Sequence, residues 1–201
     1  MIPLVTMTAM DQYIPELSPL LRHVQKYAGT YIGTETKPLD QRDCEYGLAC
    51  FRQDDLVTIV SDGLRFVEVG VPFGGELACT LRMEQAGYAR ELIRYASGYV
   101  TETRTGLEFG QVLDNVDECF ADARIVAVLA SGHPQFATEF NYLPTRPGAT
   151  LTSDNVVFQI ITLIPLTRAE VVCAVQDTEA LYEHWDAVGP DLLDISRPST
   201  M

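Results

Sequence analysis

Four carboxylates and one phenylalanine gather in a nine-residue stretch, and their chemistry is that of recognition. Asp114, Asp117, Glu118 and Asp122 surround Phe120. At an interface an aromatic ring supplies buried area, and negative charges around it speed the encounter with a basic partner. We therefore predict that these five residues bind a protein partner. The alternative is that they form a solvated loop.

A second group of candidate residues lies in a long segment between two predicted strands. Residues 132–154 contain prolines and glycines throughout and read as a loop. Loops of this length inside compact domains usually carry function or move. We predict that His133, Phe136 and Glu139 in this loop contribute to the same partner-binding surface.

No arrangement of nucleophile and base can be read from the sequence. Ser131 lies in an Ala-Ser-Gly sequence rather than in a G-x-S-x-G turn. No histidine is placed beside a cysteine by its spacing, and the carboxylates form no readable pair of the kind that glycosidases place across a cleft. We expect no enzymatic activity and no catalytic residue.

Metal and cofactor sites are not indicated either. His23, His133 and His184 are far apart, and His184 has no second ligand four residues later. The phosphate-binding patterns G-x-x-x-x-G-K-[ST] and G-x-G-x-x-G are absent. We expect neither a bound metal nor a cofactor.

The formal net charge of −14 over 201 residues restricts the classes of partner. An acidic surface repels phosphates, so we expect no binding to nucleic acid or to anionic membranes. The charge favours a basic protein partner or serves solubility alone. A chain of this length is typical of one domain and is long enough to bury a core without a disulfide or a metal.

Cysteine usage and the amino terminus suggest the compartment. The odd number of cysteines and the lack of a C-x-x-C pair are typical of free thiols in a reducing environment. Residues 1–10 carry none of the positive charge of a secretion signal, and no apolar run approaches the ~18–20 residues that span a bilayer. We expect a cytoplasmic protein. The cysteines are Cys44, Cys50, Cys79, Cys119 and Cys173.

Cap residues and helical spacing predict the first two helices. Ser18 followed by Pro19 is an N-cap with proline at the first helical position, and Gly29 ends this helix. Residues 84–98 carry an apolar stripe at helical spacing and predict a second helix that packs on the core.

The end of the chain predicts a strand that runs into a capped helix. Residues 156–164 read as a buried strand, and Pro165 is expected to end it. Thr167 and Glu170 match the capping box that opens a helix. Asp177 is expected to cap a further helix with its own apolar side.

The remaining apolar runs predict strands. We expect a polar loop at 30–43 and then an antiparallel meander of three strands, with an Asp-Gly turn between the second and the third. The strands cluster without the alternation of strand and helix that parallel sheets show. The sequence thus favours an α+β fold, a mostly antiparallel or mixed sheet with helices packed on it. The meander is expected at 46–51, 56–61 and 64–69, and further strands at 76–82, 107–113 and 124–131.

Six segments, in order along most of the chain, resemble the suppressor of fused-like family. They are a strand and turn with a Gly-Leu pair, a Glu-Leu strand that enters a helix, the helix itself, the strand after it, the strand-to-helix junction, and an arginine-containing end. Residues 1–45 match the pattern loosely, residues 190–201 form a short tail, and the whole chain is expected to be one domain of this type. The segments are 58–64, 73–84, 89–95, 109–113, 158–170 and 194–199.

The resemblance implies a protein that binds other proteins and has no active site. Single-domain bacterial members resemble immunity proteins that neutralise a cognate polymorphic toxin, and this chain is similar to that type. We expect it to occlude the active site of a basic toxin domain, for instance a nuclease. The oligomeric state is left open.

Two other hypotheses are kept. An adaptor or scaffold holding a peptide at an exposed sheet edge would show micromolar binding with a weak salt dependence, whereas toxin binding would be tighter and salt-sensitive. An enzyme of unknown type would be favoured by a deep pocket in which two or more polar side chains converge.

Overall fold

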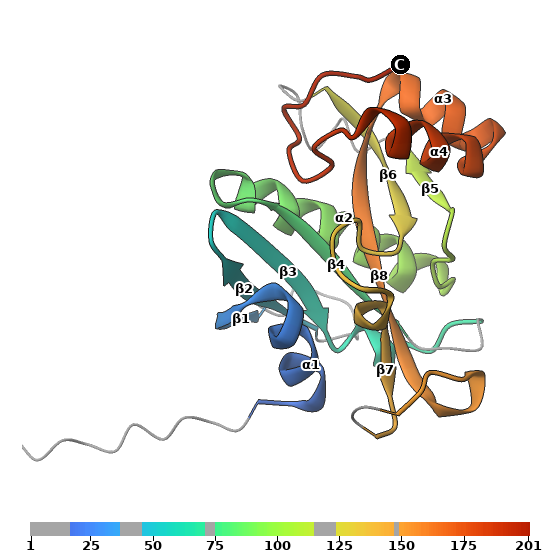
Figure 1. Cartoon of the computed structure of the whole chain (residues 1–201). Coiled ribbons are helices and arrows are strands. Elements are labelled where there is room, and N and C mark those ends of the chain that lie inside the picture. Colours follow the sequence, from blue (N-terminus) through green and yellow to red (C-terminus); the bar gives the residue numbers. More distant parts are fainter. Residues whose placement is uncertain (1–16, 37–45, 71–74, 115–123, 147–148) are drawn as a thin grey trace, which may run out of the picture.

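One mixed sheet organises the part of the chain that the computed structural model describes, residues 17–36, 46–70, 75–114, 124–146 and 149–201 (Figure 1). Its strand order is β1-β2-β3-β4-β8-β6-β5, and β7 also pairs with β8. The β4–β8 pair is parallel and the other pairs are antiparallel. The strands are β1 (Thr30–Thr36), β2 (Gly47–Gln53), β3 (Leu56–Asp62), β4 (Gly75–Arg82), β5 (Val112–Asp114), β6 (Ile125–Ser131), β7 (Tyr142–Pro144) and β8 (Val156–Thr167).

Helices cover both faces of this sheet, which confirms the predicted α+β class. Because side chains alternate along a strand, Ile161 and Leu163 of β8 pack in the core beneath α2, whereas Ile160 packs with α1 and Ile164 with α3 and α4. We call the side that carries α1, α3 and α4 the front face. The helices are α1 (Pro19–Ala28), α2 (Ala86–Thr103), α3 (Arg168–Gln176) and α4 (Thr178–Val188).

The predicted helix caps are confirmed. The hydroxyl of Ser18 accepts a hydrogen bond from the backbone N–H of Leu21 at 3.2 Å. Asp177 Oδ1 accepts from the backbone N–H groups of Glu179 and Ala180. The local sequence therefore determines where α1 and α4 begin, because each cap satisfies donors that the first helical turn leaves unpaired.

Glu170, at the start of α3, joins four parts of the fold. Its carboxylate has no exposed surface and accepts from the backbone N–H of Thr167 at 2.8 Å and from the indole N–H of Trp185 on α4 at 3.1 Å. Arg197 of the C-terminal tail donates to it at 3.0 Å and to the carbonyl of Pro165 at 2.8 Å. The strand-to-helix junction and the arginine-containing end are thus bound to each other.

Pro165 does not end the last strand, which was the expectation. It pairs with Val128 inside β8, and the strand continues to Thr167. Proline is tolerated at a strand position whose N–H has no strand partner. Pairing between β4 and β8 ends at Thr162, so Pro165 pairs with β6 only, and Arg197 occupies its carbonyl on the other side.

The predicted hairpin between β3 and residues 64–69 is also wrong. A short 3-10 helix, Leu64–Phe66, follows β3, and β4 is the strand that pairs with β3. The buried carboxylate of Glu76 accepts from the backbone N–H groups of Gly63, Leu64 and Arg65. These long-range hydrogen bonds hold the backbone after Asp62 in the 3-10 helix, so the expected two-residue turn does not form.

The expected loop at 30–43 contains a strand, β1, at one end of the sheet order. Its residues are mostly polar and the pairing is irregular at Gly33, where φ is 157°. Glu35 accepts from Arg90 of α2 at 2.8 Å. Edge strands often lack an alternating apolar pattern because little of their surface is buried, and that is why the sequence did not reveal this one.

Replacing Arg197 by alanine should cost about 3–5 kcal/mol of unfolding free energy, because it leaves the buried carboxylate of Glu170 without its cation. Urea unfolding at neutral pH measures this cost. Arg168→Ala is the matched control, since Arg168 is exposed on α3, the helix that carries Glu170. Equal stability of the two variants would show that the buried pair does not hold the tail in place.

Candidate protein-docking face

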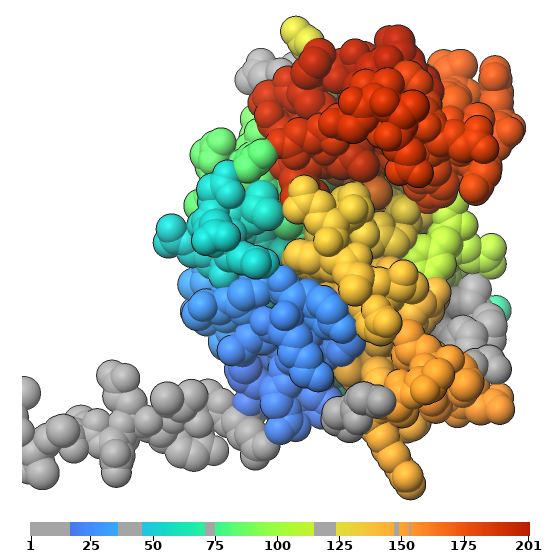
Figure 2. Space-filling view, in the orientation of Figure 1, coloured from blue at the N-terminus to red at the C-terminus, as the bar shows by residue number. Residues whose placement is uncertain are grey.

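Residues 131–146 and 149–151, below called the segment, lie on the front face between α1 and α4 and border a hollow on each side. Figure 2 shows α1, this segment and the C-terminal helices following one another on one side of the molecule. The α4 hollow, between the segment and α4, has a volume of about 500 Å³. The α1 hollow, between the segment and α1, has a volume of about 670 Å³.

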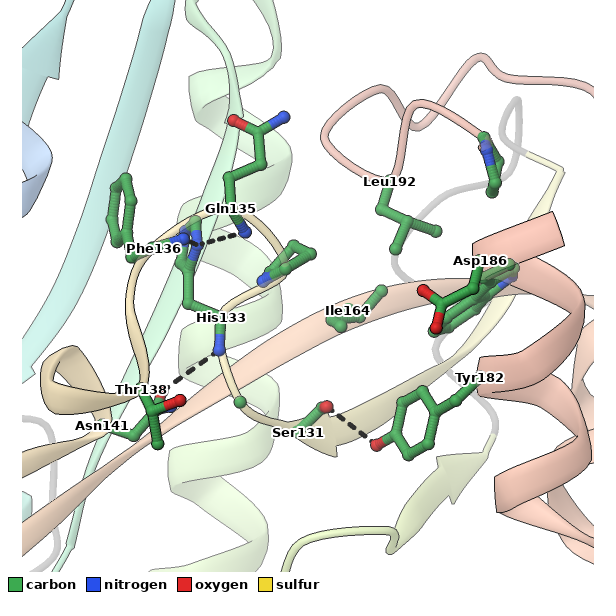
Figure 3. A pocket seen from close by; sticks show the side chains of 14 residues that line it. Ser131, His133, Gln135, Phe136, Thr138, Asn141, Ile164, Tyr182, Asp186 and Leu192 are labelled. Atoms are coloured by element: carbon green, nitrogen blue, oxygen red, sulfur yellow. Dashed lines mark hydrogen bonds between the residues drawn. The ribbon is translucent and has the colours of Figure 1, made fainter. Parts of the chain in front are cut away.

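The α4 hollow combines an apolar base with polar groups around it. Ile164 of β8 lies between the segment and α4, and Tyr182 and Asp186 of α4 face the segment across the hollow (Figure 3). The hydroxyl groups of Ser131 and Tyr182 are hydrogen-bonded at 2.8 Å. Trp185 and Leu192 complete the apolar part.

His133 lines the same hollow but serves the local fold with both ring nitrogens. Nδ1 accepts from the backbone N–H groups of Gln135 and Phe136, both at 3.1 Å, so Nε2 donates to Thr80 Oγ1 at 2.9 Å. The ring stacks on Phe136 with centroids 3.6 Å apart. Burial lowers the pKa of His133 to about 3, so the imidazole is neutral.

The α1 hollow has basic residues at its α1 wall. Arg22 and Lys26, one turn apart on α1, line it together with His23. His23 Nε2 donates to the carbonyl of Phe140 at 3.0 Å, and burial lowers the pKa of His23. Glu139 lines the opposite wall, where its charge adds to burial in raising the pKa of Tyr27.

The predicted partner-binding residues separate into two places. His133, Phe136 and Glu139 lie together in the segment between the hollows, with Glu139 exposed and His133 buried. Asp114 ends β5 opposite Ala127. That position is four residues before Ser131, roughly 13 Å along the sheet at ~3.3 Å per residue. The other four, Asp117, Glu118, Phe120 and Asp122, lie outside the described residues.

Sequence reasoning missed a second acidic feature, on α4. No lysine or arginine occurs between Arg168 and Arg197. Glu179, Glu183 and Asp186 in this span are exposed and recur at helical spacing, so they share one side of α4. A charge count over a long window finds this asymmetry, whereas short clusters of charge point only to the stretch that starts at Asp114.

Many of the described arginines are paired within the fold, which increases this asymmetry. Arg65 pairs with Asp62 and Glu76, and Arg82 pairs with Asp55 and Asp191. Other pairs join Arg90 to Glu35, Arg94 to Glu91, and Arg197 to Glu170. No ion pair to Glu179, Glu183 or Asp186 is found among the described residues.

Cys50, Cys79 and Cys173 are free, and burial raises the pKa of Cys79 to about 12, which suppresses its nucleophilic thiolate. The described residues hold no group of three or more potential metal ligands. None of the helices described is long and apolar enough to cross a membrane.

Comparison with known proteins finds no family model and no curated protein that matches this chain. Membership of the suppressor of fused-like family therefore stays a prediction.

Lowering the pH from 7 to 5 should cost about 2 kcal/mol of stability through His133 alone. The unfolded chain binds a proton below about pH 6.5, whereas the folded ring resists protonation down to about pH 3. The contribution of His133 to stability is therefore complete above the pKa of histidine in the unfolded chain, and it is lost as the pH falls below that value.

Urea unfolding of His133→Asn at several pH values tests this assignment. The Asn side chain can replace Nδ1 as an acceptor but does not titrate, so stability should depend less steeply on pH. Gln135→Ala, a change in the same segment, should keep the steep dependence. A pH dependence of His133→Asn identical to that of the unchanged chain would contradict the assignment.

Proposed function

We propose that this chain is a non-enzymatic protein-binding domain that acts in the cytoplasm and neutralises a basic toxin domain by covering its active site. The observation that carries the proposal is the acidic side of α4. Glu179, Glu183 and Asp186 stand there exposed, without a cation among the described residues. Such a surface attracts a basic partner and speeds its binding.

A toxin that acts on nucleic acid is a fitting partner for such a surface. Its substrate groove must be basic, because it binds phosphates. Carboxylates on a rigid helix can occupy the same groove and exclude the substrate. The resemblance to single-domain suppressor of fused-like proteins suggests this immunity role independently of the charge.

The groups in the α4 hollow support binding over catalysis, although polar side chains do converge there. A general base needs an available lone pair and a pKa near the working pH. In His133, Nδ1 already accepts two backbone N–H groups and the ring is neutral. The hydroxyl of Ser131 is paired with that of Tyr182 rather than with a base.

The adaptor hypothesis finds support in the position of β1. This strand lies at one end of the sheet order, and Ile32 on it is 59% exposed. An open strand edge with an apolar side chain can bind an extended peptide through main-chain hydrogen bonds.

Reversing two charges on α4 should weaken the complex with the toxin at least tenfold. We expect this loss for Glu179→Lys combined with Glu183→Lys, because opposite charges at an interface become like charges. Calorimetry with the toxin-like product of the neighbouring gene measures the affinity. Glu68→Lys combined with Glu84→Lys makes the same change in net charge at exposed positions elsewhere and is the control.

Asp117→Lys combined with Glu118→Lys tests the acidic stretch at 114–122 under the same conditions. Loss of affinity in this variant alone would show that the partner binds this stretch and not α4. Unchanged affinity in every charge-reversed variant would contradict the proposal.

Salt distinguishes the two hypotheses. Affinity for the toxin should fall steeply as ionic strength rises, because exposed charges more than about 10 Å apart are screened at 0.1 M salt. A peptide bound at the edge of β1 should dissociate at nearly the same concentration in low and high salt. Salt-independent binding of the natural partner would favour the adaptor.

A further inference from the structure

We propose that the α4 hollow receives an arginine side chain of the partner protein. This inference deepens the proposed function and rests on it for the identity of the partner. The geometry on which it depends belongs to this chain alone and can be tested without the toxin.

The base of the hollow fits an aliphatic stem. Ile164 and Leu192 line it with apolar side chains, and Trp185 adds an aromatic one. Arginine buries its methylene groups along such a surface while its charged head stays near water. An opening of about 500 Å³ accommodates one long side chain.

The charge of the lining selects a cation. Asp186 is the one acidic side chain among the described residues that line the hollow, and no lysine or arginine is among them. His133 adds no positive charge, because its ring is buried and its nitrogens are bonded within the fold. A carboxylate ligand would meet Asp186 and find no basic group to pair with.

The polar groups favour a guanidinium over an ammonium. The hydroxyl groups of Ser131 and Tyr182 are hydrogen-bonded to each other. This bond uses one proton, so each hydroxyl oxygen keeps at least one lone pair that can accept a further hydrogen bond. A guanidinium presents its donors in a flat fork, so it can bond Asp186 and a hydroxyl oxygen together.

Trp185 provides a direct measurement because it is the only tryptophan in the chain and lines the hollow. We would titrate the protein with the blocked tripeptide acetyl-Gly-Arg-Gly-amide and follow the indole N–H signal by NMR. A saturable shift is expected. The same tripeptide with lysine should bind more weakly, and with glutamate it should produce no saturable shift.

Two matched variants separate a specific site from general attraction. Asp186→Asn should weaken binding of the arginine tripeptide about fivefold, the upper range for an exposed ion pair. Glu183→Gln removes the same charge one turn earlier on α4 but does not line the hollow, and it should change the affinity less than twofold. Equal effects of the two variants, or saturable binding of the glutamate tripeptide, would overturn the inference.

The experiment also separates this inference from the proposed function. If the tripeptide fails to bind while the toxin still requires Glu179 and Glu183, the arginine site is wrong and the docking face stands. If the tripeptide binds as expected but the affinity for the toxin does not change when the charges of α4 are reversed, the arginine site stands and the proposed function is wrong.

Discussion

The buried carboxylate of Glu170 is the interaction on which the front face depends. An isolated carboxylate in a protein interior is strongly disfavoured, so its partners must stay in place. Those partners are the backbone of Thr167, the indole of Trp185 and the guanidinium of Arg197. Through them the sheet, α3, α4 and the C-terminal tail form one unit, and this unit determines where the acidic side of α4 lies.

The front face divides its charge between its two ends. Arg22 and Lys26 line the α1 hollow, whereas the exposed carboxylates of α4 form no ion pair with any described residue. A partner that covers the whole face must match both signs, and this requirement adds specificity because like charges brought together cost energy. The segment between the hollows is held by buried bonds of His133, so it offers a prearranged surface and little ordering cost.

Local features were predicted well and long-range ones were not. The caps at Ser18 and Asp177 follow from residues a few positions apart, and the sequence alone places them. The hairpin after Asp62 was mispredicted because its backbone donors bond to Glu76, a contact that turn chemistry does not include. Pro165 was mispredicted because its effect depends on which strand lies beside it.

By itself the sequence determined the α+β class, the starts of α1, α3 and α4, and an acidic protein, since capping, periodicity and net charge are properties of neighbouring residues or of sums. Only the tertiary structure decided which charges remain exposed, because pairs such as Arg82 with Asp191 join residues far apart in the chain. It likewise brought Ser131 to Tyr182 and placed Asp186 in the lining of the same hollow. A hollow of this kind is a product of packing, and linear spacing does not encode it.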